Sequence, residues 1–425
     1  MGKRVLFLTT EVGGVGGVQY AGRLILRALE DWCQPGGQVS MVTINDTRKD
    51  LEPYVAECQA FGGGRSRIST GLKALALLKH DRWDLIVLGH LNLAPLVLRL
   101  ARRRRPPCLS FIHGLEGWRP LRRLRRWGLS QFDRLLYISR HTQSRSWAAN
   151  SWLADIESEV CPLGLLPEED KHAGGANGNG RLNGKMGEKG TSFFSPPFSP
   201  RPGDLRRLGE KKDVPFSPNG EKKDVPFSPG GYALIIGRMP GSESYKGHEE
   251  LIGVWPAVME RRPDFPLLII GDGGDRPRLE ELAGRSAAAV RFLGQVDDAT
   301  RDGLLAHCRC FCMPSRGEGL GLVYLEAMRA GRPVLAGATD AGAEVVVDGV
   351  TGRAVDPKNP TELLQGILDV SGDRAAAMGK AGQTRFEEQF CYERFLERFS
   401  AHLEAVTTKA KKAKKGDASL FAPTY

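Results

Sequence analysis

The chain has no uninterrupted apolar run near the ~18 residues that a membrane-spanning helix requires. The N-terminus lacks a signal-peptide pattern, because the apolar run Val5–Thr9 is too short and is typical of a first strand. The eight cysteines include no Cys-x-x-Cys pair. Cys308, Cys310 and Cys312 alternate along a predicted strand, which favours small buried side chains over metal ligands. These absences predict a cytoplasmic protein in a reducing compartment.

The composition is that of a soluble globular protein: 41% of the 425 residues are hydrophobic and 26% are charged, enough for two domains. Residues 1–165 contain 24 lysines and arginines against 14 acidic residues, so they carry the whole net charge of +10. Arg102–Arg105 and Arg119–Arg126 hold most of the excess. These stretches fit either a solvated surface or peripheral contact with the anionic inner face of a plasma membrane. We expect no nucleic-acid partner, because no nucleic-acid-binding module accompanies the arginines.

Two parts of the chain alternate short apolar runs with helical segments, as in a parallel sheet with helices on both faces. The first, residues 1–165, has predicted strands Val5–Thr9, Val39–Ile44, Leu85–Gly89, Leu109–His113, Leu135–Ser139 and Val160–Leu163, and helices Tyr20–Trp32, Ser69–Lys79 and Leu93–Arg103. The second, residues 231–385, has strands Ala233–Gly237, Leu267–Gly271, Val290–Leu293, Phe311–Met313 and Pro333–Ala336, and helices His248–Arg261, Arg276–Ala288, Asp298–Ala306 and Val323–Ala330. The predicted fold class is α/β, with two doubly wound Rossmann-like domains.

Residues 166–230 separate the two domains and are rich in Gly, Pro, Ser, Asn and Lys. The decapeptide Gly209–Pro218 recurs unchanged as Gly220–Pro229. Because this repeat is too short and too polar for a solenoid, we predict a disordered repeat insertion. At the other end, residues 374–405 look helical, and the basic stretch 407–425 is predicted to be a disordered tail.

The segment Pro314–Met328 carries the strongest functional signal. A short apolar run precedes it and an Ala/Leu/Met-rich helical segment ends it, with a glycine-rich turn between. The glycines let backbone N–H groups point outward at a helix start, where the helix dipole favours anions. Glu318 lies in the turn, and Glu326 lies about one turn into the helix. Bare amides for phosphate and carboxylates for hydroxyls suit a ligand that is half diphosphate and half sugar.

Other candidate residues follow predicted strands, at the edge where open parallel sheets bind ligands. Arg238 leaves the first strand of the second domain, and Lys246 precedes the next helix. Two cations at the ends of one loop can converge on a diphosphate, although a pair of exposed surface charges is the alternative. After the second strand, Gly271 and Gly273 favour either close backbone approach or a tight turn.

The first domain has two further candidates. The turn that contains Gly16 and Gly17 follows the first strand, but its spacing fits a dinucleotide-binding fingerprint only loosely. His113 ends the fourth strand directly before a glycine. A histidine in this place is either structural or part of a functional cleft.

Together these motifs resemble the retaining glycosyltransferases of family 4. The resemblance rests on Glu318-x7-Glu326 with Gly-Leu-Gly-Leu inside it, on the Arg238-to-Lys246 loop, on the Gly-Asp-Gly turn and on the N-terminal Gly-Gly-Val loop. It covers nearly the whole chain except residues 166–230 and the C-terminal tail. It implies the GT-B architecture, in which two Rossmann-like domains face a central cleft. It also implies that a helix over residues 386–406 crosses back to the first domain.

The resemblance further implies roles for individual residues. Arg238 and Lys246 would hold the donor diphosphate. Glu318 would accept hydroxyls of the transferred sugar, Glu326 the ribose hydroxyls, and His113 would lie near the anomeric carbon and the acceptor. The remaining donor-binding positions would be Gly319, Leu320, Gly321, Leu322, Gly271 and Gly273 in the second domain and Gly16 and Gly17 in the first.

The implied reaction moves a hexose-type sugar from a nucleotide diphosphosugar to an acceptor hydroxyl in polysaccharide, lipopolysaccharide or glycolipid synthesis. No metal or other cofactor is expected, because Arg238 and Lys246 fill the charge role of magnesium and the chain lacks a convincing Asp-x-Asp in a cleft loop. Two alternatives are a different GT-B activity, such as a sugar-nucleotide epimerase, and a non-catalytic sugar-nucleotide-binding protein.

Overall fold

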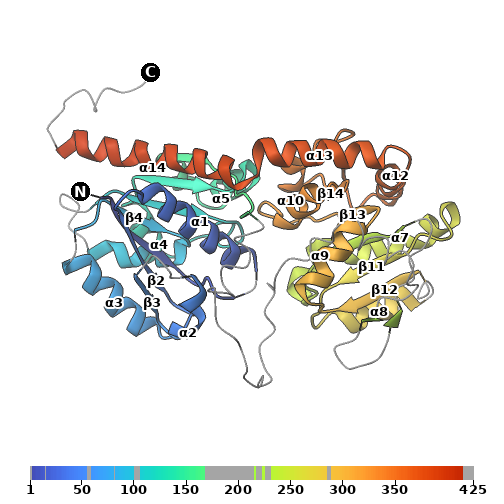
Figure 1. Ribbon diagram of the computed structural model, residues 1–425, viewed down its shortest axis with the longest axis horizontal. Coiled ribbons are helices and arrows are strands. Elements are labelled where there is room, and N and C mark those ends of the chain that lie inside the picture. Colours follow the sequence, from blue (N-terminus) through green and yellow to red (C-terminus); the bar gives the residue numbers. More distant parts are fainter. Residues whose placement is uncertain are drawn as a thin grey trace. The chain divides into compact units, whose positions relative to one another are not determined.

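The computed structural model describes residues 2–14, 16–54, 59–80, 82–99, 106–167, 215–216, 223–224, 231–284 and 289–414. The chain divides into two compact units, shown in Figure 1. Unit 1 comprises Met1–Gly180 together with Gln389–Tyr425, and unit 2 comprises Arg181–Glu388. None of the helices in the described part of the chain is both long and apolar enough to cross a bilayer.

Unit 1 is built on a seven-stranded parallel sheet in the order β3-β2-β1-β4-β5-β6-β7. Its strands are β1 (Arg4–Thr9), β2 (Gln38–Thr43), β3 (Gln59–Gly62), β4 (Leu85–Leu88), β5 (Cys108–Ile112), β6 (Arg134–Tyr137) and β7 (Ser158–Val160). The sequence predicts all of these except β3, and it places the last strand too late, at Val160–Leu163 instead of Ser158–Val160. The edge strand β3 is short and contains a single large apolar residue, Phe61, so it has no apolar run to reveal it.

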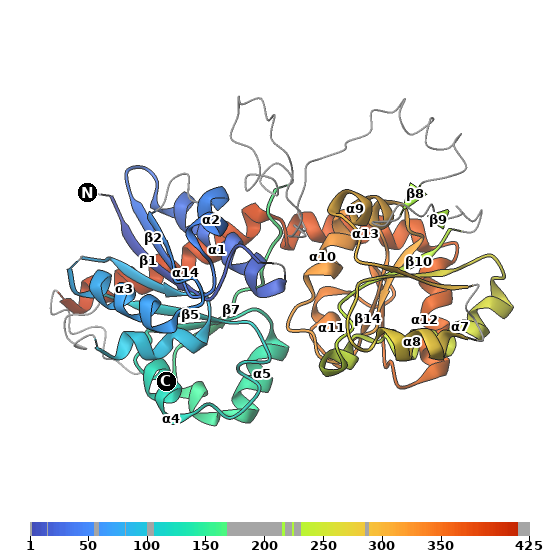
Figure 2. The same cartoon turned by 90° about the horizontal axis from the view of Figure 1, so that it is seen from below.

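Helices cover both faces of this sheet, and Figure 2 shows α4 and α5 on one side and α1 and α2 on the other. The helical elements are α1 (Gly17–Cys33), α2 (Arg48–Leu51), η1 (Glu52–Tyr54), α3 (Arg67–His80), η2 (Leu91–Arg99), α4 (Arg123–Leu129), α5 (Arg140–Ala149) and η3 (Ser151–Asp155). The α-helix predicted from Leu93 is instead the 3₁₀ helix η2. Pro95 lies inside it and cannot donate the backbone hydrogen bond that an α-helix needs.

The C-terminal region is two helices, α13 (Ala375–Gln389) and α14 (Tyr392–Lys414). In unit 1, α14 packs against α1, and the ring of its Phe399 lies 5.2 Å from that of Phe111 in β5. Glu404 of α14 accepts hydrogen bonds from Lys3 Nζ and Trp32 Nε1, both at 2.9 Å. These contacts attach the end of the chain to the first sheet.

The predicted disordered tail begins too early. Helix α14 continues through Thr407, which is buried, to Lys414. Alanine and lysine dominate this stretch, and both favour helix, so its charge alone does not make it unfold. Residues 415–425 lie outside the described residues.

Unit 2 contains a six-stranded parallel sheet in the order β12-β11-β10-β13-β14-β15. Its strands are β10 (Ala233–Ile236), β11 (Leu267–Ile270), β12 (Val290–Gly294), β13 (Cys310–Met313), β14 (Val334–Gly337) and β15 (Gly352–Val355). Its helices are η5 (Gly241–Lys246), α7 (His248–Arg261), α8 (Arg276–Ala283), α9 (Asp298–His307), α10 (Leu322–Arg329), α11 (Gly342–Val345), α12 (Pro360–Ser371) and α13. Two doubly wound parallel sheets confirm the predicted fold class. Cys308, Cys310 and Cys312 are all buried in unit 2.

Most of the predicted insertion, residues 166–230, lies outside the described residues, as does Arg102–Arg105. Leu166 belongs to the folded part, because it is buried and its N–H donates to the Tyr20 hydroxyl at 2.6 Å. Within the repeats, β8 (Pro215–Phe216) pairs antiparallel with β9 (Lys223–Asp224), one strand from each copy of the decapeptide.

Candidate functional site

Arg238 and Lys246 lie at the two ends of the loop that joins β10 to α7. Arg238 is exposed, and Lys246 is the last residue of η5. The Lys246 side chain passes over Gly237, with its Cδ 3.0 Å from the place where a Cβ would stand. Gly247 follows with φ 87°, and a Cβ there would lie 2.6 Å from the Pro314 carbonyl oxygen. Only glycine allows the loop after β10 to come this close to the loop after β13.

Lys246 meets Glu318 across this contact. Its Nζ lies 2.7 Å from Glu318 Oε1, and the two side chains are only 14% and 15% exposed. The Glu318 N–H donates to Asp340 Oδ2 at 2.8 Å, and the Gly342 N–H donates to Asp340 Oδ1 at 2.8 Å. Burial raises the pKa of Asp340 to about 6 despite these two hydrogen bonds. Asp340 therefore fixes the backbone of Glu318, a role that its place after β14 does not reveal in the sequence.

The turn after Glu318 ends at the N-terminus of α10. Gly321 caps this helix in the left-handed conformation, φ 83°, and has no side chain to bond the first amides of α10. A Cβ at Gly321 would stand 2.4 Å from the Tyr324 ring, whose hydroxyl donates to the Met313 carbonyl at 2.7 Å. Gly319 and Leu320 lead into this turn, and Leu322 is the first residue of the helix. Lys246, Glu318 and this helix N-terminus thus share one edge of unit 2.

Glu326, one turn into α10, faces a second charged group on α9. Arg301 is buried, and Glu326 is the acidic group that does most to raise the pKa of its guanidinium against the opposing effect of burial. Arg301 Nη1 lies 3.6 Å from Oδ1 of Asp298, which is 3% exposed. Neither carboxylate oxygen of Asp298 has a hydrogen-bond partner among the described residues. Burial raises the pKa of Asp298 to about 6, with Arg301 opposing this shift.

Sequence reasoning treats Asp297 and Asp298 as a helix start, which the structure confirms for Asp297. Its side chain accepts from the Thr300 N–H at 2.8 Å and caps α9. A cap requires only one of the two carboxylates. The presence of a second acidic residue beside the cap is therefore the feature of the sequence that could have pointed to Asp298.

Gly271 and Gly273 allow close approach between loops. Both have positive φ, 134° and 158°. A Cβ at Gly271 would lie 2.0 Å from the Gly237 carbonyl oxygen, and one at Gly273 would lie 2.3 Å from the Met239 carbonyl. The sequence offers two explanations for these glycines, close backbone approach and a tight turn. The structure shows close backbone approach, because the loop after β11 packs directly on the loop that carries Arg238.

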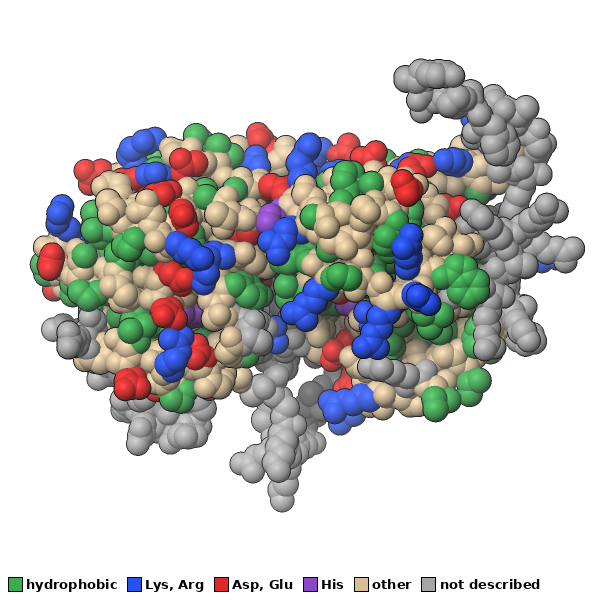
Figure 3. All heavy atoms as spheres, turned by 180° about the vertical axis from the view of Figure 1, so that it is seen from behind, with side chains coloured by type: hydrophobic (Ala, Val, Ile, Leu, Met, Phe, Trp, Pro, Cys, Tyr) green, Lys and Arg blue, Asp and Glu red, His purple; other side chains and the backbone are tan. Residues whose placement is uncertain are grey.

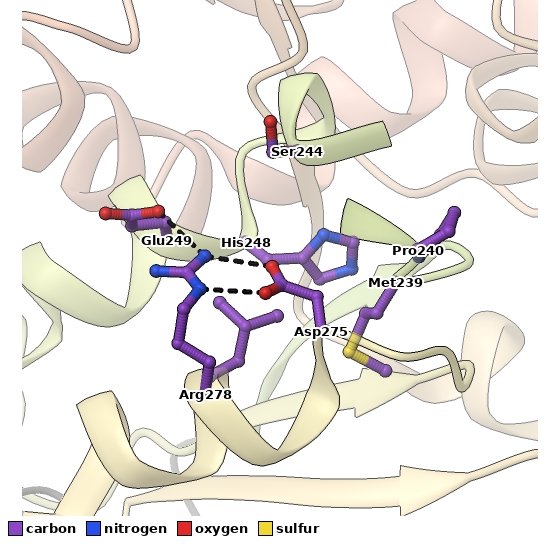
Figure 4. Close-up of a pocket in the computed structure, with 8 residues that line it drawn as sticks. Met239, Pro240, Ser244, His248, Glu249, Asp275 and Arg278 are labelled. Carbon is purple, nitrogen blue, oxygen red and sulfur yellow. Dashed lines mark hydrogen bonds and ion pairs between the residues drawn. The ribbon is translucent and has the colours of Figure 1, made fainter. Parts of the chain in front are cut away.

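A small pocket lies beside this packing and is shown in Figure 4. Arg278 bonds to both oxygens of Asp275, at 2.8 and 2.9 Å, and to Glu249 at 2.9 Å. His248 lines the pocket, and burial, together with Lys246, lowers its pKa to about 4. His248 is therefore neutral and adds no charge beside Lys246.

In unit 1, Gly16 and Gly17 begin α1, with Gly16 as the N-cap at φ 143°. Asp46, after β2, fixes the preceding turn: its carboxylate accepts from the N–H groups of Val12 and Gly13 at 2.8 and 3.1 Å. Burial raises the pKa of Asp46, and these hydrogen bonds oppose that shift. Sequence reasoning did not identify Asp46 as the support of this loop.

His113 lies after β5 and is 8% exposed. Its Nε2 is 2.7 Å from the Gly89 carbonyl oxygen, so Nε2 carries the proton and donates. The other ring nitrogen, Nδ1, is buried and has no hydrogen-bond partner among the described residues. The backbone N–H of His113 donates to Glu116 Oε1 at 2.6 Å. The contact with Gly89 thus fixes the ring through Nε2 and leaves the buried Nδ1 for a further hydrogen bond.

Two protein families match the chain. Residues 15–150 match the family described as Glycosyltransferase Family 4. Residues 231–373 match the family described as Glycosyl transferases group 1. The chain belongs to the family 4 glycosyltransferases. The resemblance seen in the sequence is thereby confirmed for both units.

Two curated relatives are mannosyltransferases of Corynebacterium glutamicum and Mycobacterium tuberculosis. The chain is 37% identical over 169 residues to the GDP-mannose-dependent monoacylated alpha-(1-6)-phosphatidylinositol monomannoside mannosyltransferase of Corynebacterium glutamicum, a match covering 38% of this chain and 44% of the relative. It is 39% identical over 165 residues to the phosphatidyl-myo-inositol mannosyltransferase of Mycobacterium tuberculosis, covering 36% of this chain and 43% of the relative. The chain thus spans less than half the length of the curated relatives that it matches.

Solved structures share the fold over nearly the whole chain. The complex of Anabaena HepE with UDP superposes with a TM-score of 0.68 at 18% identity and covers 95% of this chain and 100% of that one. Sucrose-phosphate synthase from Thermosynechococcus elongatus gives 0.62 at 19% identity, covering 96% and 99%. These likenesses establish the GT-B fold for this family 4 member.

Proposed function

We propose that this family 4 glycosyltransferase transfers a sugar, with retention at the anomeric carbon, from a guanosine diphosphosugar to a hydroxyl of a glycolipid acceptor. The observation that carries the proposal is the group of Lys246, Glu318 and the N-terminus of α10, where Gly321 is the N-cap, with Arg238 at the other end of the Lys246 loop. It combines donors for a diphosphate with a carboxylate for sugar hydroxyls. The relatives named above support a GDP-mannose donor and a phosphatidylinositol-type acceptor.

The reaction builds negative charge on the departing diphosphate. Arg238 can hold two phosphate oxygens with its planar guanidinium, while Lys246 adds a point charge. The ammonium of Lys246 has three donors, so it can keep its bond to Glu318 and still reach a phosphate. The amides at the start of α10 add the positive end of a helix dipole. These groups are fixed before the reaction, so they stabilise the charge as it develops.

The carboxylates orient the donor, and no covalent intermediate on the protein is required. Glu318 would accept hydroxyls of the sugar and Glu326 those of the ribose. In the mechanism implied by the family resemblance, the acceptor hydroxyl attacks the anomeric carbon from the face that the phosphate leaves, and the leaving phosphate takes the proton of that hydroxyl. The anomeric configuration is therefore retained. His113 would accept a hydrogen bond at Nδ1 from a hydroxyl of the acceptor and hold it in place.

Asp298 favours guanine as the donor base. Guanine presents two adjacent donors, N1–H and the 2-amino group, which match the two oxygens of the Asp298 carboxylate, neither of which accepts a hydrogen bond from the described residues. Uracil presents carbonyl oxygens on both sides of its N3–H, which a buried carboxylate would repel. Arg301 interacts with both Asp298 and Glu326, so a nucleotide with its ribose at Glu326 would have its base near Asp298.

The direct test incubates the full chain with GDP-mannose and vesicles that contain phosphatidylinositol, and measures GDP release and a mannosylated lipid. We expect both products, and neither without the lipid. UDP-glucose with the same vesicles is the comparison donor. The non-catalytic alternative would be favoured if the protein binds GDP but releases no GDP from GDP-mannose with any of a panel of lipid acceptors.

Replacing Glu326 by alanine should weaken GDP binding about tenfold or more, because a charge-assisted hydrogen bond is worth about 1.5–3 kcal/mol. Calorimetry measures the affinity. 2′,3′-Dideoxy-GDP is the control: it lacks both ribose hydroxyls, so it should bind the wild type and the variant alike. Equal loss of affinity for both nucleotides would place the ribose elsewhere.

A further inference from the structure

The turn that carries Glu318 also contacts the Lys246 loop through the residues that precede this pair. The Arg316 N–H donates to the Tyr245 carbonyl at 2.9 Å. The Tyr245 ring lies against Gly317, because a Cβ on that glycine would stand 3.0 Å from the ring atoms Cγ and Cδ2. The residues directly before Lys246 are therefore packed on the residues directly before Glu318.

An ion pair joins the same two segments through side chains. Arg316 Nη2 lies 2.8 Å from Oε1 of Glu250 in the first turn of α7, and the two side chains are 30% and 18% exposed. Figure 3 shows Lys and Arg side chains beside Asp and Glu side chains on the surface that it views, and exposed pairs of this kind add little to stability. A half-buried pair is screened less by salt, so it can fix the segments that it joins.

This ion pair makes only one of the two hydrogen bonds that its groups can form. Nε and Nη2 lie on one edge of a guanidinium, and a carboxylate placed side-on to that edge accepts from both. Nη2 has its partner, but Nε of Arg316 and Oε2 of Glu250 are both buried and have no hydrogen-bond partner among the described residues. These are the two atoms that a side-on pair would join.

The missing bond makes a second arrangement of this contact favourable. A buried donor and a buried acceptor without partners are costly, because each has lost its hydrogen bonds to water. Donation from Arg316 Nε–H to Glu250 Oε2 would remove both costs together. It would also bring the start of α7 closer to the turn that carries Glu318.

We propose that Arg316 and Glu250 are positioning residues of the donor site, and that they complete the side-on pair when a nucleotide diphosphosugar binds. The inference rests on the proposed donor site: a diphosphate at Lys246 and sugar hydroxyls at Glu318 bridge the two segments, so the ligand binds the closed arrangement better. The completed pair then fixes Lys246 and Glu318 around the leaving group. Neither positioning side chain contacts the reacting atoms.

Arg316→Lys tests the second hydrogen bond. Lysine keeps the charge and one bond to Glu250, but it cannot form a side-on pair. Turnover of sugar transfer to the phosphatidylinositol vesicles should fall about ten- to a hundredfold, the cost of reacting groups that are held about 1 Å out of place, while the thermal midpoint stays unchanged. Arg353→Lys is the matched control. Arg353 is an ion-paired arginine of the edge strand β15 with 23% of its side chain exposed, and the variant should transfer sugar like the wild type.

A double-mutant cycle separates this role from two independent contributions to stability. Glu250→Gln also prevents the side-on pair, because its amide N–H would face the N–H of Arg316. Each single variant should lose turnover, and the double variant Arg316→Lys with Glu250→Gln should lose no more than either, since all three lack the same interaction. Losses that multiply in the double variant would contradict a shared role.

The Nε–H of Arg316 reports the pair directly in the wild type. Its NMR signal is identified by its absence in Arg316→Lys. Addition of GDP-mannose without lipid should move this signal downfield, because the proton gains a carboxylate partner, and GDP should move it less, because GDP has no sugar for Glu318. An unmoved signal with bound GDP-mannose, or wild-type turnover in Arg316→Lys, would overturn the proposal. A wild type that neither binds nor turns over GDP-mannose would refute the proposed donor, and this inference with it.

Discussion

Replacement of Arg238 by alanine should lower the turnover of sugar transfer by about two to three orders of magnitude, the loss seen when one preorganised donor to a developing anion is removed. Arg238 is exposed, so its removal leaves no cavity and unpacks no core. The thermal midpoint should therefore change little. Turnover of GDP-mannose and a melting curve on the same preparation measure both.

Arg261→Ala is the matched control. Arg261 is an exposed arginine of the same unit, in the last turn of α7, far along that helix from Lys246. It should transfer sugar at the wild-type rate. Arg238→Lys should recover only part of the activity, because an ammonium cannot hold two phosphate oxygens side by side. Near-normal transfer by Arg238→Ala would remove Arg238 from the mechanism.

Asp298→Asn should reduce the preference for GDP over UDP by about 5- to 150-fold, the range for one bidentate base contact of about 1–3 kcal/mol. The amide keeps the shape of the carboxylate but replaces one acceptor oxygen by a donor. Inosine diphosphate, which lacks the 2-amino group, separates the two contacts. The wild type should bind it more weakly than GDP, and the variant should bind the two nearly alike.

The same carboxylate predicts a pH dependence. Burial raises the pKa of Asp298 to about 6, so below this pH the nucleotide-free protein holds a proton there. Guanine binding would have to release that proton, and the ratio of GDP to UDP affinity should fall by up to tenfold per pH unit below about 6. It should be flat above that pH. The phosphates of GDP and UDP titrate alike, so their titration cancels in this ratio of affinities. In Asp298→Asn the ratio should not change with pH. A wild-type ratio that does not fall would exclude Asp298 from base recognition.

The apolar runs of the strands were sufficient to predict most of the two sheets. The missed strands, β3 and β15, are edge strands: β3 has one large apolar residue, and β15 is Gly-Arg-Ala-Val. Edge strands are partly covered by loops, so their composition is close to that of a loop. The break between α13 and α14 was also not predicted from the sequence, since it involves only Phe390 and Cys391.

For the candidate site, the sequence by itself determined the residue types and their order: a glycine-rich turn between two glutamates, two cations around one loop, and a histidine at a strand end. Only the tertiary structure decided which of them meet. The Lys246–Glu318 pair joins positions 72 apart, through a glycine that admits a carbonyl where a side chain would collide. The supports Asp340 and Asp46 follow strands, like many acids with no such role. Asp298 looked like a helix start, because a buried carboxylate without hydrogen-bond donors around it is defined by its neighbours in space, and the sequence does not show those neighbours.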